Sequence, residues 1–96
     1  MVKVRLPNSV EVEIETIGTY IAEHDSVAAV RVMQSLYQRC ISLETMPYRG
    51  SEFRDDYRRI FEGTYQILYR VEEIDNETIV YIVTVHHMSR RDPDLV

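Results

Sequence analysis

Two short turn sequences divide the second half of the chain, and they constrain its fold more than any other feature. Glu62-Gly63 and Asp75-Asn76 are pairs that favour tight turns. They separate three strand-like segments, at residues 57–61, 65–71 and 79–85. Strands joined by tight turns run antiparallel beside one another. The sequence therefore predicts a three-strand antiparallel meander over residues 54–86. Its last strand is apolar on both faces and should be central in the sheet.

The first residues predict a strand followed by a helix. Residues 1–7 alternate apolar and polar side chains, and Pro7 ends this strand. Apolar residues also alternate with glutamates over 10–15, but an apolar stripe at helical spacing continues beyond that segment while the alternation stops. We therefore predict a helix, capped by Asn8 or Ser9, in which Gly18 would allow close approach of a second helix. The stripe consists of Val10, Ile14, Ile17 and Ile21.

A second apolar stripe, from Ala29 to Leu43, predicts a longer helix. Asp25 or Ser26 would cap it, and Pro47 would end it. Because the link between the helices is short, they should form an antiparallel hairpin over 9–46 that packs on one face of the sheet. We predict a single α+β domain over residues 1–96, with a tail at 87–96 and an open second sheet face.

Charge and composition exclude several classes of function. The formal net charge is −5, from 11 basic and 16 acidic residues. Nucleic-acid binders usually carry a surplus of positive charge, so the balance argues against a dedicated RNA or DNA binder, and no direct DNA binding is expected of this chain without a partner protein. Ten of the eleven basic residues are arginine, which suits pairing with carboxylates at an interface. The single cysteine, Cys40, makes no internal disulfide, so we expect a reducing cytoplasm. No signal peptide or membrane-spanning segment is predicted.

Five short sequence elements occur in an uncommon order and spacing. They are Tyr20-Ile21-Ala22, Leu43-x-x-x-Pro47-x-x-Gly50, Arg58-Arg59-Ile60, Gly63-x-Tyr65-x-Ile67-x-Tyr69-Arg70-Val71, and Val85-His86-His87-x-x-Arg90-Arg91-Asp92. In this order they resemble the RelE/ParE superfamily of toxins from bacterial type II toxin–antitoxin systems. The resemblance implies a small α+β protein that is neutralised by a cognate antitoxin, which wraps an extended, partly helical segment around it.

The superfamily has two branches with different targets. RelE-like members resemble ribosome-dependent endonucleases of messenger RNA, whereas ParE-like members poison DNA gyrase. RNA cleavage needs an acid, a base and cations at the phosphate. Here a nuclease would use Arg58 or Arg59 as the cation and His86 or His87 as the acid or base.

Three features favour the ParE-like branch, in which no residue is catalytic. Gln66 stands where RelE-like nucleases often carry a cation, and no aromatic residue follows Met88. Residues 49–70 carry five arginines and four acidic residues, a net charge of only +1. The favoured function is therefore inhibition of DNA gyrase. A messenger-RNA endonuclease and an inactive member that only binds an antitoxin remain as alternatives.

The resemblance also suggests where the antitoxin binds. Five arginines from the predicted strands and tail could converge on the open sheet face and dock an acidic antitoxin segment, by strand addition or by a helix in a groove. Alternatively, they pair with nearby acidic residues. Neighbouring histidines on a strand point to opposite faces, so we expect no metal and no cofactor. The candidate arginines are Arg58, Arg59, Arg70, Arg90 and Arg91.

Overall fold

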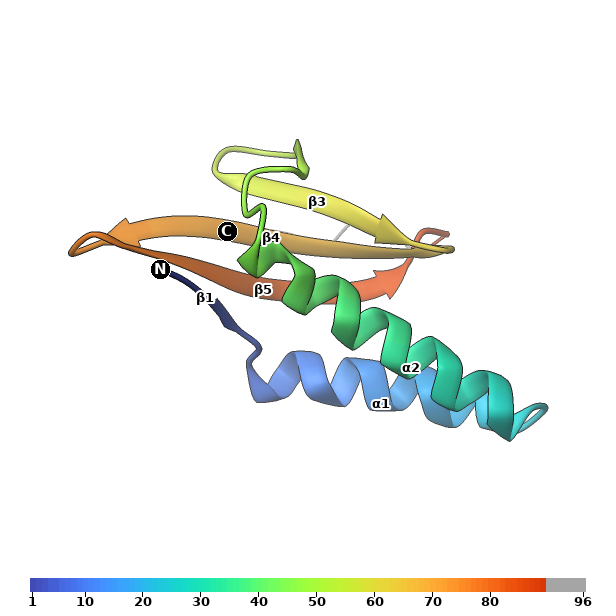
Figure 1. Ribbon diagram of the computed structural model, residues 1–96. Coiled ribbons are helices and arrows are strands. Elements are labelled where there is room, and N and C mark those ends of the chain that lie inside the picture. The colour runs from blue at the N-terminus through green and yellow to red at the C-terminus, as the bar shows by residue number, and fades with distance from the viewer. Residues whose placement is uncertain (90–96) are drawn as a thin grey trace.

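The computed structural model describes residues 1–89 and has an α+β fold, with two helices followed by antiparallel strands (Figure 1). None of the helices in these residues is long and apolar enough to cross a membrane. The elements are β1 (Val2–Arg5), α1 (Asn8–Ala22), α2 (Ser26–Ile41), a 3₁₀ turn (Ser42–Glu44), β2 (Ser51–Glu52), β3 (Tyr57–Glu62), β4 (Tyr65–Ile74) and β5 (Glu77–His87).

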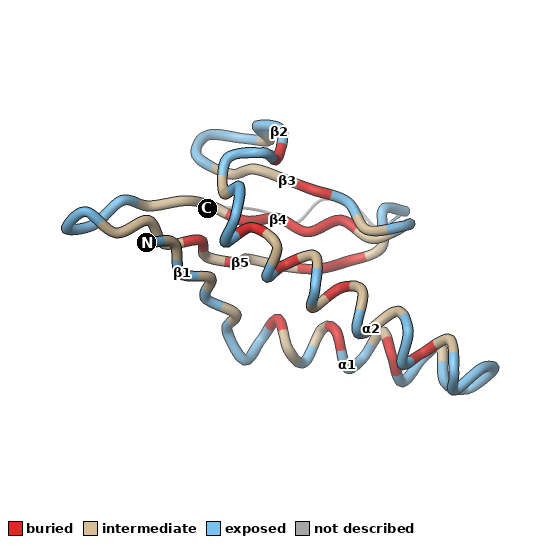
Figure 2. The backbone as a smooth tube through the Cα atoms, in the orientation of Figure 1, coloured by how far each residue is buried: buried red, intermediate tan, exposed pale blue. Residues whose placement is uncertain are grey.

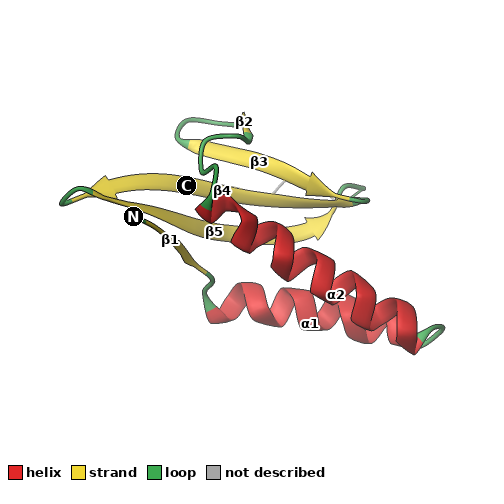
Figure 3. Cartoon of the chain, viewed as in Figure 1, coloured by secondary structure: helices red, strands yellow, loops and turns green. Residues whose placement is uncertain are grey.

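One mixed sheet, in the order β1-β5-β4-β3-β2, carries the helical hairpin on one face (Figure 3). Strands β3, β4 and β5 form the predicted antiparallel meander. The expectation that 79–85 is central is confirmed, because β5 lies between β4 and β1. At the turn between β4 and β5, Asp75 and Asn76 both have positive φ, at 50° and 65°, which is typical of a tight hairpin turn. Two features were not predicted: β1 runs parallel to β5, and β2 exists at all.

The helix boundaries differ from the prediction at two places. Neither Asn8 nor Ser9 caps α1, because the helix begins at Asn8 itself and the Pro7 carbonyl accepts from Val10 N at 3.0 Å. Helix α2 ends at Ile41 rather than near Pro47. There the Ser42 hydroxyl donates to the Arg39 carbonyl at 2.6 Å, and the chain tightens into a 3₁₀ turn. The start of α2 is as predicted, with the Asp25 carboxylate accepting from Ala28 N.

The core lies between the hairpin and the inner sheet face (Figure 2). The helical stripes and alternate residues of the strands meet there, which buries the apolar area that drives folding. Cys40 is fully buried in this core. The fully buried helical residues of the core are Val10, Ile14, Leu36 and Cys40, and the fully buried strand residues of the core are Ile67, Tyr69, Val80, Ile82 and Val85.

Gly18 of α1 lies against Met33 of α2, which is the close helix contact that the sequence predicted. A Cβ atom at Gly18 would lie 2.2 Å from Met33 Sδ and 2.8 Å from Met33 Cγ. We expect Gly18→Ala to lower the free energy of unfolding by about 1 kcal/mol, because overpacking outweighs the gain in helix propensity. Urea unfolding measures this difference.

The same substitution in a Met33→Ala background provides the control. With the thioether gone, Gly18→Ala should be neutral or stabilising by up to about 1 kcal/mol. A Gly18→Ala protein that is more stable than the wild type, with Met33 present, would show that the helices do not need glycine at this contact.

Candidate functional site

A row of three polar side chains crosses the sheet face that the helices leave open. Arg59 of β3, Gln66 of β4 and His86 of β5 form this row. Arg59 Nη1 donates to Gln66 Oε1 at 3.4 Å, and the Gln66 amide nitrogen lies 3.4 Å from His86 Nε2. The side chains are well covered, since Gln66 is 4% exposed and His86 is 7% exposed. The row therefore ties three strands together from β3 to β5.

The neighbouring histidines point to opposite faces of the sheet. His86 pairs with Gln66 and His87 pairs with Tyr65, and successive residues of a strand alternate between faces. The His87 ring contacts the Tyr65 ring edge-on, with centroids 5.4 Å apart, on the face that carries the helices. The two imidazoles are therefore separated by the sheet.

The neighbouring arginines are separated in the same way. Arg58 pairs with Tyr69, which packs in the core, so Arg58 lies on the helix-bearing face. Its guanidinium donates to the carbonyls of Gly50 at 2.9 Å and Tyr48 at 3.2 Å, and so holds the loop before β2. The four nuclease candidates are therefore divided between the two sheet faces. Arg59 and His86 lie on the open face with Gln66 between them, whereas Arg58 and His87 lie on the helix-bearing face.

The predicted antitoxin-binding arginines do not all converge either. Arg59 and Arg70 lie on the open face, but Arg58 does not, and Arg90 and Arg91 lie outside the described residues. Arg70 forms an ion pair with Glu72 and stacks over Tyr81, with its guanidinium carbon 4.6 Å from the ring centre.

Arg59 has a different environment, since its guanidinium carbon lies 5.0 Å from the Phe53 ring centre and 5.8 Å from that of Phe61. Its Nε atom is the one buried side-chain nitrogen or oxygen in residues 1–89 that has no hydrogen-bond partner. A role for Arg59 in antitoxin binding stays a prediction.

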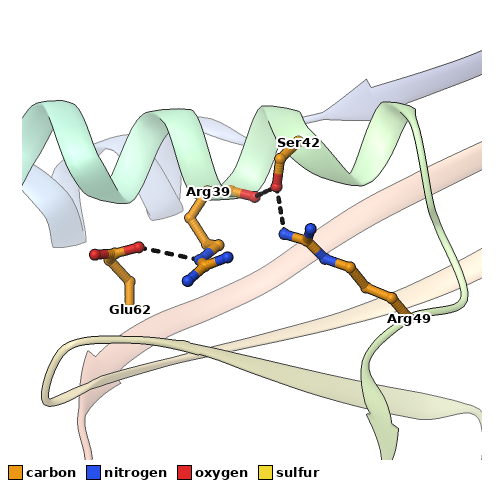
Figure 4. A network of polar contacts seen from close by, with 4 residues as sticks. All are labelled: Arg39, Ser42, Arg49 and Glu62. Carbon is orange, nitrogen blue, oxygen red and sulfur yellow. Dashed lines mark hydrogen bonds and ion pairs between the residues drawn. The ribbon is translucent and has the colours of Figure 1, made fainter.

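A hollow of about 440 Å³ lies at the edge of β3, and sequence reasoning missed it. We call it the arginine hollow. Figure 4 shows the Arg39 and Arg49 guanidiniums on the same side of α2. Arg39 comes from α2, and Arg49 comes from the loop before β2. The lining residues are Arg39, Arg49, Gly50, Ser51, Arg59, Ile60 and Phe61.

The arginines of the hollow are only partly neutralised. Arg39 Nε donates to Glu62 Oε1 at 3.0 Å, with 40% of the Arg39 side chain exposed. Arg49 donates to the Ser42 hydroxyl, and within residues 1–89 it has no acidic partner. The hollow therefore concentrates positive charge on a protein whose net charge is −5.

Gly50 and Tyr69 hold the loop of the hollow against the sheet. Gly50 N donates to Tyr69 Oη at 2.9 Å, and a Cβ atom at Gly50 would lie 2.9 Å from the Arg59 carbonyl oxygen. Burial raises the pKa of Tyr69 above its ordinary value, against smaller opposing effects of the Gly50 hydrogen bond and of Arg58 and Arg49. The Tyr69 hydroxyl is therefore neutral at pH 7 and available as the acceptor.

A second cleft, of about 530 Å³, separates α1 from the end of β5. Glu13 lines this cleft, and its carboxylate accepts from Thr84 Oγ1 at 2.6 Å and from Val85 N at 3.1 Å. Glu13 thus occupies the edge of β5 beyond the last residue that β1 pairs, which is Tyr81. The apolar part of the cleft is formed by Val12, Ile17, Tyr20, Tyr65 and Val85.

Comparison with known families identifies the chain. Residues 4–92 match the model of the ParE toxin of the type II toxin–antitoxin system parDE. The small α+β fold with an open sheet face is thus that of a type II toxin in the RelE/ParE superfamily. Within that superfamily the chain belongs to the ParE toxin family, as its sequence elements predicted. A comparison with curated proteins found no match.

Proposed function

We propose that this toxin acts by inhibiting DNA gyrase and that a cognate antitoxin neutralises it. Family membership supplies the toxin class and the antitoxin partner. The observation that supports gyrase over messenger RNA is the separation of the nuclease candidates. A general acid or base must come within hydrogen-bond reach of its substrate. His86 is 7% exposed and lies on the opposite face from His87 and Arg58.

The charge distribution also favours a protein target. Docking into ribosomal RNA requires several cations free to neutralise phosphates. On the open face, Arg70 is paired with Glu72, and Arg59 contacts Gln66 and two aromatic rings. The chain has a net charge of −5, and these two arginines already contact other side chains of the protein. Both properties suit contact with another protein better than contact with RNA.

The decisive experiment measures inhibition of gyrase and cleavage of messenger RNA with the same preparation of purified toxin. Purified toxin should inhibit supercoiling by gyrase and accumulate cleaved plasmid, while ribosomes translating a reporter messenger show no codon-phased cuts by primer extension. Gyrase inhibition without messenger cleavage is the expected result. Codon-phased cuts without gyrase inhibition would assign the endonuclease function. Neither activity, in a folded protein, would assign an inactive antitoxin-binding member.

A His86→Gln variant tests the role of the buried imidazole. Loss of a general acid or base typically lowers a rate by about 10²–10⁴-fold. We expect instead that gyrase inhibition by His86→Gln stays within about threefold of the wild type, since the substitution keeps a polar partner for Gln66. Thermal unfolding by circular dichroism controls for folding. Messenger cleavage that disappears with this substitution would overturn the proposal.

A further inference from the structure

In residues 1–89 three strands extend past a shorter neighbour: β5 past β1, β4 past β3, and β3 past β2. Strand β5 continues past β1, and there the Glu13 carboxylate accepts from the edge N–H of Val85. Strand β3 continues past β2, which pairs only with Arg58 and Arg59. Within residues 1–89, no strand pairs with 60–62 on that side, and no side chain hydrogen-bonds to their backbone. Unpaired strand edges are templates for another strand.

The arginine hollow lies directly against this open edge. Ile60 and Phe61 of β3 line it together with Arg39 and Arg49. A guanidinium has five N–H donors, and Arg49 donates one hydrogen bond from its guanidinium to the Ser42 hydroxyl. Arginine donors are well suited to bidentate pairing with a carboxylate. The unpaired edge of β3 and the remaining guanidinium N–H donors of the arginine hollow therefore lie at one place on the molecule.

We propose that the edge of β3 at 60–62 and the arginine hollow together bind an extended acidic segment of the antitoxin. The segment pairs its backbone with β3 and directs one carboxylate to Arg49 and a second toward Arg39. Side chains two apart on a strand lie on the same face, roughly 6.6 Å from each other. The matching sequence is therefore an acidic residue, any residue, then a second acidic residue. This inference rests on the antitoxin partner that the toxin family implies, and not on gyrase as the target.

The backbone distinguishes a peptide from a nucleic acid at this site. A strand edge presents both N–H donors and C=O acceptors. A peptide strand satisfies both kinds of group, whereas a phosphate backbone offers only acceptors. Main-chain pairing supplies affinity, and the arginines supply the preference for acidic side chains.

Binding of the purified cognate antitoxin, measured by titration calorimetry, tests the role of Arg49. Arg49→Gln should weaken binding about tenfold, because a charge-assisted hydrogen bond is lost. Arg31→Gln is the matched control, since Arg31 is exposed on α2 and does not line the hollow. It should change affinity less than twofold. Higher salt should weaken the wild type more than Arg49→Gln. Equal affinities of Arg49→Gln and wild type would overturn the assignment.

Amide hydrogen exchange of the wild-type toxin tests the strand pairing without any substitution. Bound antitoxin should slow exchange at Phe61 at least tenfold, while a random-sequence duplex DNA of 12 base pairs should not. Unchanged exchange at 60–62 in the antitoxin complex, or equal protection by the duplex, would refute the docking mode. Gyrase inhibition by the wild-type toxin is measured separately, so an incorrect target leaves these results interpretable.

Discussion

The free energy of unfolding should fall by up to about 4 kcal/mol between pH 9 and pH 12 because of a single buried thiol. Burial raises the pKa of the Cys40 thiol from 9.0 to about 12. The unfolded chain loses this proton near pH 9 while the folded protein keeps it. The stabilisation is therefore complete below pH 9 and is lost as pH rises toward 12. A difference of one between the folded and unfolded pKa values corresponds to about 1.4 kcal/mol of stability.

Urea unfolding at a series of pH values measures this loss, and Cys40→Ala provides the control. Tyr69, whose pKa burial also raises, is present in both proteins. The difference between the two pH profiles therefore isolates the thiol. Cys40→Ala should be less stable than the wild type at pH 7 and should converge with it at high pH. Parallel profiles would mean that Cys40 reaches solvent in the folded protein.

Gly50→Ala should lower the free energy of unfolding by about 2–3 kcal/mol and distort the arginine hollow. A Cβ atom there would lie 2.5 Å from Tyr69 Oη and 2.9 Å from the Arg59 carbonyl oxygen. Tyr69 is fully buried and the carbonyl belongs to the sheet, so neither gives way cheaply. Urea unfolding measures the stability, and amide exchange at Gly50 reports whether its hydrogen bond to Tyr69 survives.

Gly63→Asn is the comparison for this prediction. Gly63 has a φ of +58°, and a Cβ atom there would meet nothing within 4 Å. Asparagine tolerates this conformation better than most residues, so the loss should stay below about 1 kcal/mol. A Gly50→Ala protein as stable as Gly63→Asn would show that the loop moves freely away from β3.

Local sequence patterns were sufficient to predict most of the fold. The apolar stripe through Val10 and Ile14 is buried as expected, and the turn at Asp75-Asn76 joins β4 to β5. Both signals are carried by residues close together in the chain. Strand β2 has only two residues, and the loop before it is held by a hydrogen bond from the Arg58 guanidinium to the Gly50 carbonyl. No periodicity exists over so short a segment, which is why the sequence did not reveal it.

The candidate site was harder to predict, because its residues belong to separate elements. Alternation along a strand correctly predicts that His86 and His87 diverge. The same rule separates Arg58 from Arg59, although the sequence suggested that they share a face. Arg39 and Arg49 come close to β3 only because α2 and the loop that follows it pack beside that strand. The excess of arginine over lysine was the one indication of such a site in the sequence.

The connection between α1 and α2, at residues 23–25, projects beyond the sheet in Figure 1. The backbone of this connection bonds locally, since His24 N and Asp25 N both donate to the Ile21 carbonyl. Exposed turns of this kind accept inserted sequence better than packed segments do. A fluorescent label or an epitope placed there would lie away from the arginine hollow and from the β3 edge, so the toxin could be followed in living cells.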